Sequence, residues 1–236
     1  MTPLRVLSAH QPSYLPYPGL INKILQSDVF VIMDNAQYVK GEWHNRNRIR
    51  TQDSFRWLTI PVHSHLGWAI NQVKPTTAEW LGRHERIVNE HYRRSPFLAK
   101  GDAMWSALRE VSDQNLGTIG WTSTFALMEA LGCPVTAEVR YASDLQGEDE
   151  VFDKRWTLQR WCDRTGCNAY LTGRGGLNYL NPTDWRSESS PRLLTAEFRP
   201  VRYRQMYPGW VPDLSALDLL FCVAEPRSYL ISRKER

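Results

Sequence analysis

No stretch of this 236-residue sequence approaches the roughly 18 uninterrupted apolar residues that a membrane-spanning helix needs. The first residues, Met1 to Arg5, also lack the charged and then apolar pattern of a secretory signal. There is no low-complexity tract, and hydrophobic residues make up 42% of the chain, which is enough for a packed core. We therefore expect a folded cytoplasmic protein that makes no contact with a membrane.

Cysteine is scarce, and the 4 cysteines do not form a C-x-x-C pair. Cys162 and Cys167 are spaced poorly for zinc, and in a cytosolic protein such thiols are expected to be reduced and mostly buried. A cysteine nucleophile stays open as an alternative. His63 and His65 lack a third ligand nearby. We therefore predict no metal site and no cofactor.

The standard phosphate-binding fingerprints are absent as well. The loop Gly173-Arg174-Gly175-Gly176 lacks the Lys-Ser/Thr ending of a P-loop, and it is not a G-x-G-x-x-G motif. It does follow Ala169 to Thr172, a segment typical of a strand, so its amides are candidates for an anion-binding nest. Glycines of a tight turn would produce the same letters. The net charge of +4 does not by itself indicate a nucleic-acid partner.

The richest part of the chain is its first third. An apolar run, Leu4 to Ala9, leads into His10, and a second apolar run, Val29 to Met33, ends at Asp34. Between them, Gly19 to Gln26 has the apolar stripe of a helix. This order of strand, loop, helix and strand predicts a βα unit of an open α/β sheet. Ligands of such sheets bind at the carboxyl ends of the strands.

The remaining pattern continues this alternation. Further strands are predicted at residues 69–73, 135–141, 169–172 and 195–199, a hairpin at 49–62, and helices from about 77 onward and at 102–113, 116–131, 150–165 and 214–223. No linker or internal repeat divides the chain. The predicted fold is a single three-layer, Rossmann-like α/β domain over residues 1–236, with a mostly parallel sheet and a β-hairpin insertion at about 45–73.

His10 and Asp34 are the candidate catalytic residues. His10 lies in a loop stiffened by three prolines, which lower the entropic cost of holding the ring in one pose. Such an imidazole can act as a general base or bind a phosphate or carbonyl oxygen, or it can simply shape the loop. Asp34 should lie nearby if the strands are parallel. It could orient His10, bind a substrate ammonium, hold Mg²⁺ through water, or cap a turn.

Residues 44–50 alternate cations with amides. If this run is extended, Arg46, Arg48 and Arg50 project from one face, where like charges repel each other. That arrangement favours an anionic partner, with pairing to Asp and Glu elsewhere in the fold as the alternative. Arginine suits phosphate or carboxylate, and asparagine both donates and accepts, so Asn45 and Asn47 belong to the same predicted binding segment.

Ordered blocks along most of the chain resemble the WbqC-like family. These blocks are His10-Gln11-Pro12, Tyr14-Leu15-Pro16, Lys23-Ile24, Asp28-Val29-Phe30, Asp34, Gln37-Tyr38, Lys40-Gly41, Asn45-Arg46-Asn47-Arg48-Ile49, Leu58-Thr59-Ile60-Pro61-Val62, Trp80, His84, Tyr92, Tyr170-Leu171, Gly173, Gly175-Gly176, Tyr179-Leu180, Tyr207-Pro208-Gly209, Leu214-Ser215 and Asp218-Leu219-Leu220-Phe221. The resemblance implies a role in surface-polysaccharide or secondary-metabolite biosynthesis. It also implies transfer of an aminoacyl group, such as glycyl, onto an amino sugar.

The first functional hypothesis is therefore a transferase that forms an amide on an amino sugar or another small-molecule amine. The donor would be aminoacyl-tRNA or a nucleotide-linked acyl group. His10 would be the base, Asp34 would steer it or the ammonium, and Arg46 with Arg48 would hold the donor's phosphate. The other predicted substrate-binding residues are Gln11, Tyr14, Gln37, Tyr38, Lys40, Asn45, Asn47, His84, Gly173, Gly175, Gly176 and Tyr179.

Two alternatives belong to other classes. One is a nucleotide-dependent ligase or nucleotidyl transferase, and the other is a non-catalytic module that binds tRNA or an anionic glycan.

The transferase hypothesis also predicts the geometry of the site. One concave, positively charged site should be lined by residues that each follow or adjoin a predicted strand, namely His10, Asp34, Asn45, Arg46, Arg48 and the loop Gly173 to Gly176.

Overall fold

A five-stranded sheet forms the centre of the protein. The computed structural model describes residues 3–147, 153–178, 180 and 190–231. The strands are β1 (Val6–His10), β2 (Val29–Ile32), β7 (Glu138–Tyr141), β8 (Ala169–Thr172) and β9 (Arg192–Thr195). They are arranged in the order β7-β2-β1-β8-β9, and every neighbouring pair is parallel. The direction of winding reverses between β1 and β8, as in a Rossmann-like fold. The predicted fold class is confirmed.

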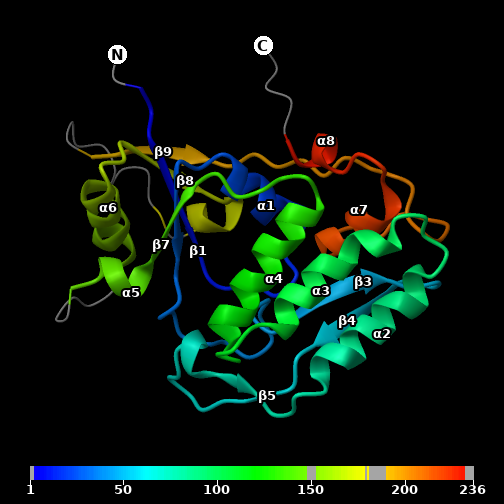
Figure 1. The fold of residues 1–236 in the computed structure, drawn as a ribbon. Helices are drawn as coiled ribbons and strands as arrows, with labels where there is room; N and C mark the ends of the chain where they lie inside the picture. Colours follow the sequence, from blue (N-terminus) through cyan, green and yellow to red (C-terminus); the bar gives the residue numbers. More distant parts are fainter. Residues whose placement is uncertain (1–2, 148–152, 179, 181–189, 232–236) are drawn as a thin grey trace.

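Helices cover both faces of this sheet (Figure 1). On one face lie α1 (Pro18–Leu25) and α4 (Leu116–Ala130), and on the other lie α5 (Ala142–Leu145) and α6 (Lys154–Thr165). All residues of β2 are buried, as in a central parallel strand. Phe30 and Ile32 pack into the larger core with α1 and α4, whereas Val29 and Val31 pack into a cluster that includes Trp161 of α6. The sheet thus separates two apolar layers.

Between β2 and β7 the chain leaves the sheet and forms an insertion. It contains the antiparallel hairpin of β3 (Arg46–Arg50) and β4 (Phe55–Thr59), and a second small pair, β5 (Val62–His63) with β6 (Lys74–Pro75). The helices α2 (Trp80–Tyr92) and α3 (Asp102–Arg109), with the short 3₁₀ turn η2 (Leu98–Gly101) between them, lead from there to α4. The insertion therefore extends beyond the predicted hairpin at about 45–73.

One predicted strand in the insertion is wrong. Residues 70–72 form a 3₁₀ turn, η1 (Ile70–Gln72), in place of a strand. The Gln72 side chain accepts a hydrogen bond from the Ala69 backbone N–H, and this local bond competes with strand pairing.

The end of the chain runs back to the hairpin and to the loop that follows β1. After the 3₁₀ turn η3 (Arg174–Asn178) and β9, a segment without regular secondary structure leads to α7 (Ala216–Cys222) and α8 (Arg227–Leu230). The Ser215 N–H donates to Arg48 O, and the Ala216 N–H donates to Pro16 O. These bonds hold residues 210–216 beside the carboxyl end of β1. No helix in the described part of the chain is both long enough and apolar enough to cross a lipid bilayer.

Helix α4 supports the loop after β1 by a close approach at Gly120. A Cβ built on Gly120 would lie 3.0 Å from Pro12 Cβ and 3.1 Å from the Ser13 backbone nitrogen. The Thr124 hydroxyl, one turn later, donates to Ser13 O at 3.1 Å. The path of the loop therefore depends on the absence of a side chain at residue 120.

Replacing Gly120 by Ala is expected to destabilise the protein by about 1–3 kcal/mol, because backbone atoms must move apart. Gly82 of α2 is the matched control. It is exposed, a Cβ there would meet nothing within 4 Å, and Gly82→Ala should add up to about 1 kcal/mol of stability. Urea unfolding of the two variants measures both effects. Equal stabilities would contradict the close approach.

Candidate functional site

A cleft of about 1180 Å³ opens where the carboxyl ends of β1 and β8 meet. His10 and Gln11 enter it from β1, and Thr172 with the loop Gly173 to Gly176 enters it from β8. These two strands are neighbours at the point where the winding reverses, which is where open α/β sheets bind ligands. The structure thus brings together five of the predicted site residues, namely His10, Gln11, Gly173, Gly175 and Gly176.

The His10 imidazole is neutral and has one defined tautomer. Its Nδ1 lies 2.7 Å from the Gln11 carbonyl oxygen. Because a carbonyl can only accept, Nδ1 carries the hydrogen, and Nε2 keeps its lone pair. Burial, and next the neighbouring Lys23 ammonium, lower the pKa of His10 to about 3. At neutral pH this side chain can therefore accept a hydrogen bond through Nε2, and its pKa would have to rise, as it does beside a bound anion, before it could hold a second proton.

Lys23 is a residue of this cleft that was missed from the sequence. It comes from α1, its exposed fraction is only 6%, and its Nζ donates to Ala9 O at 2.7 Å. Burial lowers its pKa to about 8, so the ammonium is mostly protonated at pH 7. The overlooked signal is that Lys23 is the single charged residue of a helix whose other residues are mostly apolar.

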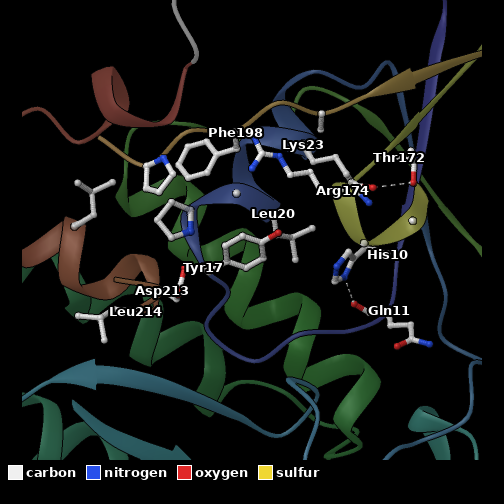
Figure 2. Close-up of a pocket in the computed structure, with 18 of the residues that line it drawn as sticks. His10, Gln11, Tyr17, Leu20, Lys23, Thr172, Arg174, Phe198, Asp213 and Leu214 are labelled. Carbon is white, nitrogen blue, oxygen red and sulfur yellow. Dashed lines mark hydrogen bonds between the residues drawn. The ribbon is translucent and has the colours of Figure 1, made fainter. Parts of the chain in front are cut away.

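The β8 loop adds backbone and a second cation to the same end of the cleft. Arg174 is exposed and lies with Lys23 and His10 around one part of the cleft (Figure 2). Gly173 and Gly175 do not have positive φ angles, and a Cβ on either would meet no protein atom within 4 Å. Neither backbone conformation nor packing therefore requires glycine there, whereas a ligand lying against the backbone would. The Gly176 amide already donates to Gly173 O.

The other end of the cleft is mostly apolar. Its walls include Tyr17 and Leu20 at the start of α1, and Phe198 and Leu214 from the segment before α7 (Figure 2), a segment that also contributes Trp210 to the lining of the cleft. The two ends of the cleft thus differ in chemistry. The end at the strand termini suits an anion, and the aromatic end suits a flat or apolar group.

Asp213 stands at the rim of the apolar end. It has a φ of +55°, which is uncommon for a residue with a side chain. Arg48 Nη2 donates to Asp213 O at 2.8 Å, and the same nitrogen is 3.9 Å from the Asp213 carboxylate. Arg48 therefore supports the rim from behind.

Asp34 does not partner His10, and this corrects the expected pairing. Its carboxylate accepts hydrogen bonds from the Ser143 backbone N–H (3.1 Å) and the Ser143 hydroxyl (2.8 Å) at the first turn of α5. The chain after β2 turns toward β7, the neighbour on the outer side, and away from β1. Asp34 is not among the described residues that line the cleft.

The arginine and asparagine run of β3 also lies outside the cleft. Asn45 donates to Ile60 O and so joins the two ends of the hairpin, and Asn47 donates to Tyr14 O and Leu15 O and so ties the hairpin to the loop after β1. The guanidinium carbons of Arg46 and Arg48 lie 4.3 Å and 5.6 Å from the centre of the Trp57 ring. The sequence predicted that an anionic ligand in the site would offset the repulsion between these arginines. Within the protein, cation–π contacts and backbone carbonyls offset it instead.

The remaining predicted binding residues are placed elsewhere. Tyr14 is fully buried and its hydroxyl lies 2.9 Å from His84 Nδ1, while His84 Nε2 donates to Thr59 O, so this pair belongs to the core. Burial lowers the pKa of His84 to about 4. Gln37 bridges to Ala69, Tyr38 is 8% exposed, and Lys40 is on the surface. Tyr179 lies outside the described residues.

Neither a metal centre nor a reactive thiol emerges at the cleft. Within the described ranges, His, Cys, Asp and Glu side chains form no group of three or more that could hold a metal ion. The 4 cysteines are free thiols, and burial raises the pKa of each of them. A raised pKa disfavours the thiolate that nucleophilic catalysis needs.

Comparison with known proteins places the chain in a family. The profile of the WbqC-like protein family matches residues 11–228, a span that begins directly after His10 and contains Gln11 and the cleft residues of β8 and its loop. The chain belongs to the WbqC-like protein family. A similar member is the uncharacterised protein Rv1507c of Mycobacterium tuberculosis, which is 29% identical over 226 residues, covering 93% of this chain and 95% of the relative. No solved structure matches the chain significantly.

Proposed function

We propose that this protein is a cytoplasmic transferase that binds a phosphate-bearing donor in the cleft and transfers an acyl or aminoacyl group from it to an amine. The observation that carries the proposal is the anion-binding end of the cleft. Lys23 from α1 lines this end together with the glycine loop, which carries the second cation, Arg174, and whose backbone at Gly173 and Gly175 is open to a ligand. The amide-forming chemistry is supported by the resemblance to family members thought to modify amino sugars.

The reaction needs a group that can carry a proton. The amine nitrogen attacks the donor's carbonyl carbon, the bond from that carbon to the leaving oxygen breaks, and an amide forms. The proton that the nitrogen loses must reach the leaving oxygen. His10 Nε2 has a free lone pair at the cleft and is the group placed to relay this proton, and a bound anionic donor would raise the pKa of the ring above its value of about 3, toward the range that a general base needs. Lys23 would stabilise the negative charge that develops on oxygen.

A second candidate is a nucleotide-dependent ligase or nucleotidyl transferase. It is favoured by the strand order and by the aromatic end of the cleft, which could hold a base next to the anion-binding end. The two candidates differ in the donor that they consume.

If the protein is an aminoacyl transferase, purified protein incubated with aminoacyl-tRNAs and amino sugars such as glucosamine should yield an amide detectable by mass spectrometry. Acceptor-dependent consumption of ATP without tRNA would instead favour the ligase.

The anion site can be tested without knowing the substrate. Inorganic pyrophosphate should bind the wild-type protein in titration calorimetry, and Lys23→Met should lower its affinity about 10- to 100-fold, because a charge-assisted hydrogen bond is lost. Since the pKa of Lys23 is lowered to about 8, affinity should fall as the pH rises through that value and the ammonium loses its charge. The affinity of the Lys23→Met variant should not show this fall near pH 8. Comparing the affinities of the variant and the wild type at each pH removes the effect of the titration of pyrophosphate itself.

Gly175→Ala provides a matched change in the backbone cradle. Its thermal stability should stay near that of the wild type, because the new methyl group meets no protein atom within 4 Å. Its affinity for pyrophosphate should nevertheless fall. Unchanged affinity in both Gly175→Ala and Lys23→Met would rule out an anion site at this end of the cleft.

A further inference from the structure

The outer face of the β3–β4 hairpin combines arginines with stacked aromatic rings. Cross-strand pairing sets Arg48 opposite Trp57, and Arg46 and Phe55 lie on the same face. Trp43, from the loop before β3, adds a ring whose centroid is 5.4 Å from that of Trp57. The guanidinium carbon of Arg46 is 4.3 Å from the Trp57 ring centre, and that of Arg48 is 4.9 Å from the Phe55 ring centre. We call these five residues the arginine–aromatic face.

This face is partly open to solvent and keeps the positive charge of Arg46, whereas the Arg48 side chain is 18% exposed and its Nη2 lies 3.9 Å from the Asp213 carboxylate. Trp43 and Phe55 are 40% and 38% exposed, which is high for rings of this size. Arg46 donates to Gly41 O, but it takes part in no ion pair within the described part of the chain. The next arginine of the strand shows the contrast, because Arg50 is 2% exposed and its Nη atoms are bound by three backbone carbonyls.

The face adjoins the mouth of the cleft at two points. Glu42 lines the cleft and directly precedes Trp43. Asp213 also lines the cleft, and its carbonyl accepts the hydrogen bond from Arg48. A ligand that ends in the cleft could therefore continue across the face.

We propose that the arginine–aromatic face binds a single strand of nucleic acid, with bases stacked on the exposed rings and phosphates held by Arg46 and Arg48. Every base has a flat π-face, so aromatic rings interleaved with cations suit a single strand of any sequence. The two arginines are two residues apart on a strand, about 7 Å, which is comparable to the spacing of phosphates in an extended strand. An acidic peptide would use the arginines but would leave the rings without a stacking partner.

One part of this proposal, the delivery of a donor to the cleft, rests on the proposed function. If the donor is an aminoacylated RNA, the strand on the face would lead its acylated end into the cleft toward His10. Binding of the strand itself is independent of any chemistry in the cleft. The two ideas can therefore fail separately.

The test is fluorescence anisotropy with a fluorescein-labelled 12-nucleotide RNA and with DNA of the same sequence. The wild-type protein should bind at low salt, with an affinity that falls as salt rises. Trp43→Ala should weaken binding about 10-fold or more, since one stacked base is lost, and Trp57→Ala should also weaken it, because the ring that holds the Arg46 guanidinium and the Trp43 ring in place is removed. Trp57→Phe, which keeps a ring, should lose less. Arg46→Gln should reduce the slope of log affinity against log salt by about 1.

Cleft variants separate this surface from the proposed reaction. Lys23→Met should lose pyrophosphate binding but retain the oligonucleotide, whereas Trp43→Ala should show the reverse. Binding of RNA or DNA that depends on the rings supports the inference, even if no amide is ever formed. The inference is overturned if neither strand binds, if the tryptophan variants bind as the folded wild type does, or if polyphosphate of equal charge competes as well as the oligonucleotide.

Discussion

Replacing His10 by Ala is expected to lower the rate of amide formation by about 10²–10³-fold, within the range of a lost general base. His10 Nε2 is the free lone pair at the anion-binding end of the cleft. The thermodynamic cost should stay within about 1 kcal/mol, because the ring makes one hydrogen bond to the adjacent residue. His10→Gln is the control, since an amide can accept a hydrogen bond but cannot take up a proton. It should restore donor affinity without restoring turnover.

The pH profile of the same reaction offers an independent check. Because the pKa of His10 is lowered to about 3, its imidazole stays neutral from neutral pH down to acid pH, and no limb near pH 6.5 should come from it. The unfolded chain, with an ordinary histidine pKa, binds this proton first. The His10 contribution to stability is therefore lost as pH falls from about 6.5 toward 3, and His10→Gln should flatten that decline. A wild-type activity limb near 6.5 that disappears in the variant would contradict a buried, neutral His10.

The largest effect on stability is expected for Asp218→Ala, a loss of about 3–5 kcal/mol. Asp218 in α7 is fully buried and accepts hydrogen bonds from the hydroxyls of Tyr92 (2.7 Å) and Tyr203 (2.8 Å). The Tyr92 hydroxyl in turn accepts from the Arg50 backbone N–H. One carboxylate thus joins α7, α2, the hairpin and Tyr203, which lines the cleft. Its removal leaves two hydroxyls without their acceptor and opens a cavity. Thermal unfolding should shift down by roughly 6–12 °C or more.

The pH dependence of Asp218 has a sign opposite to that of an ordinary paired carboxylate. Burial is the main cause that raises its pKa above the usual value. The folded state therefore holds this proton more tightly than the unfolded chain does. The contribution of Asp218 to stability is greatest at pH values below its pKa in the unfolded chain. It declines as the pH rises through its pKa in the folded protein. Measured against Asp218→Asn, which cannot ionise, the wild type should be relatively more stable at pH 4 than at pH 7. The opposite trend would mean that the carboxylate is stabilised as an anion.

The sequence predicted the central βα units because their signals are local. Strand β2 is a run of apolar residues that are buried on both faces, and α1 has an apolar stripe at helical spacing. The predicted strand Ala169–Thr172 agrees with β8 at both ends. In contrast, residues 69–73 were predicted as a short strand but contain η1, where the Gln72 side chain accepts a hydrogen bond from the Ala69 backbone N–H, a local contact that competes with strand pairing.

The site divides in the same way. The sequence was enough to predict that His10 and the loop after β8 lie together, because both segments follow strands and parallel strands end at one edge of the sheet. Sequence alone could not tell that Asp34 turns outward to Ser143, or that the β3 arginines stack on rings from β4. Lys23 and the walls formed by residues 198–214 likewise depended on packing. Such contacts join residues far apart in the chain, so their geometry is set by tertiary packing and leaves no periodic signal in the sequence.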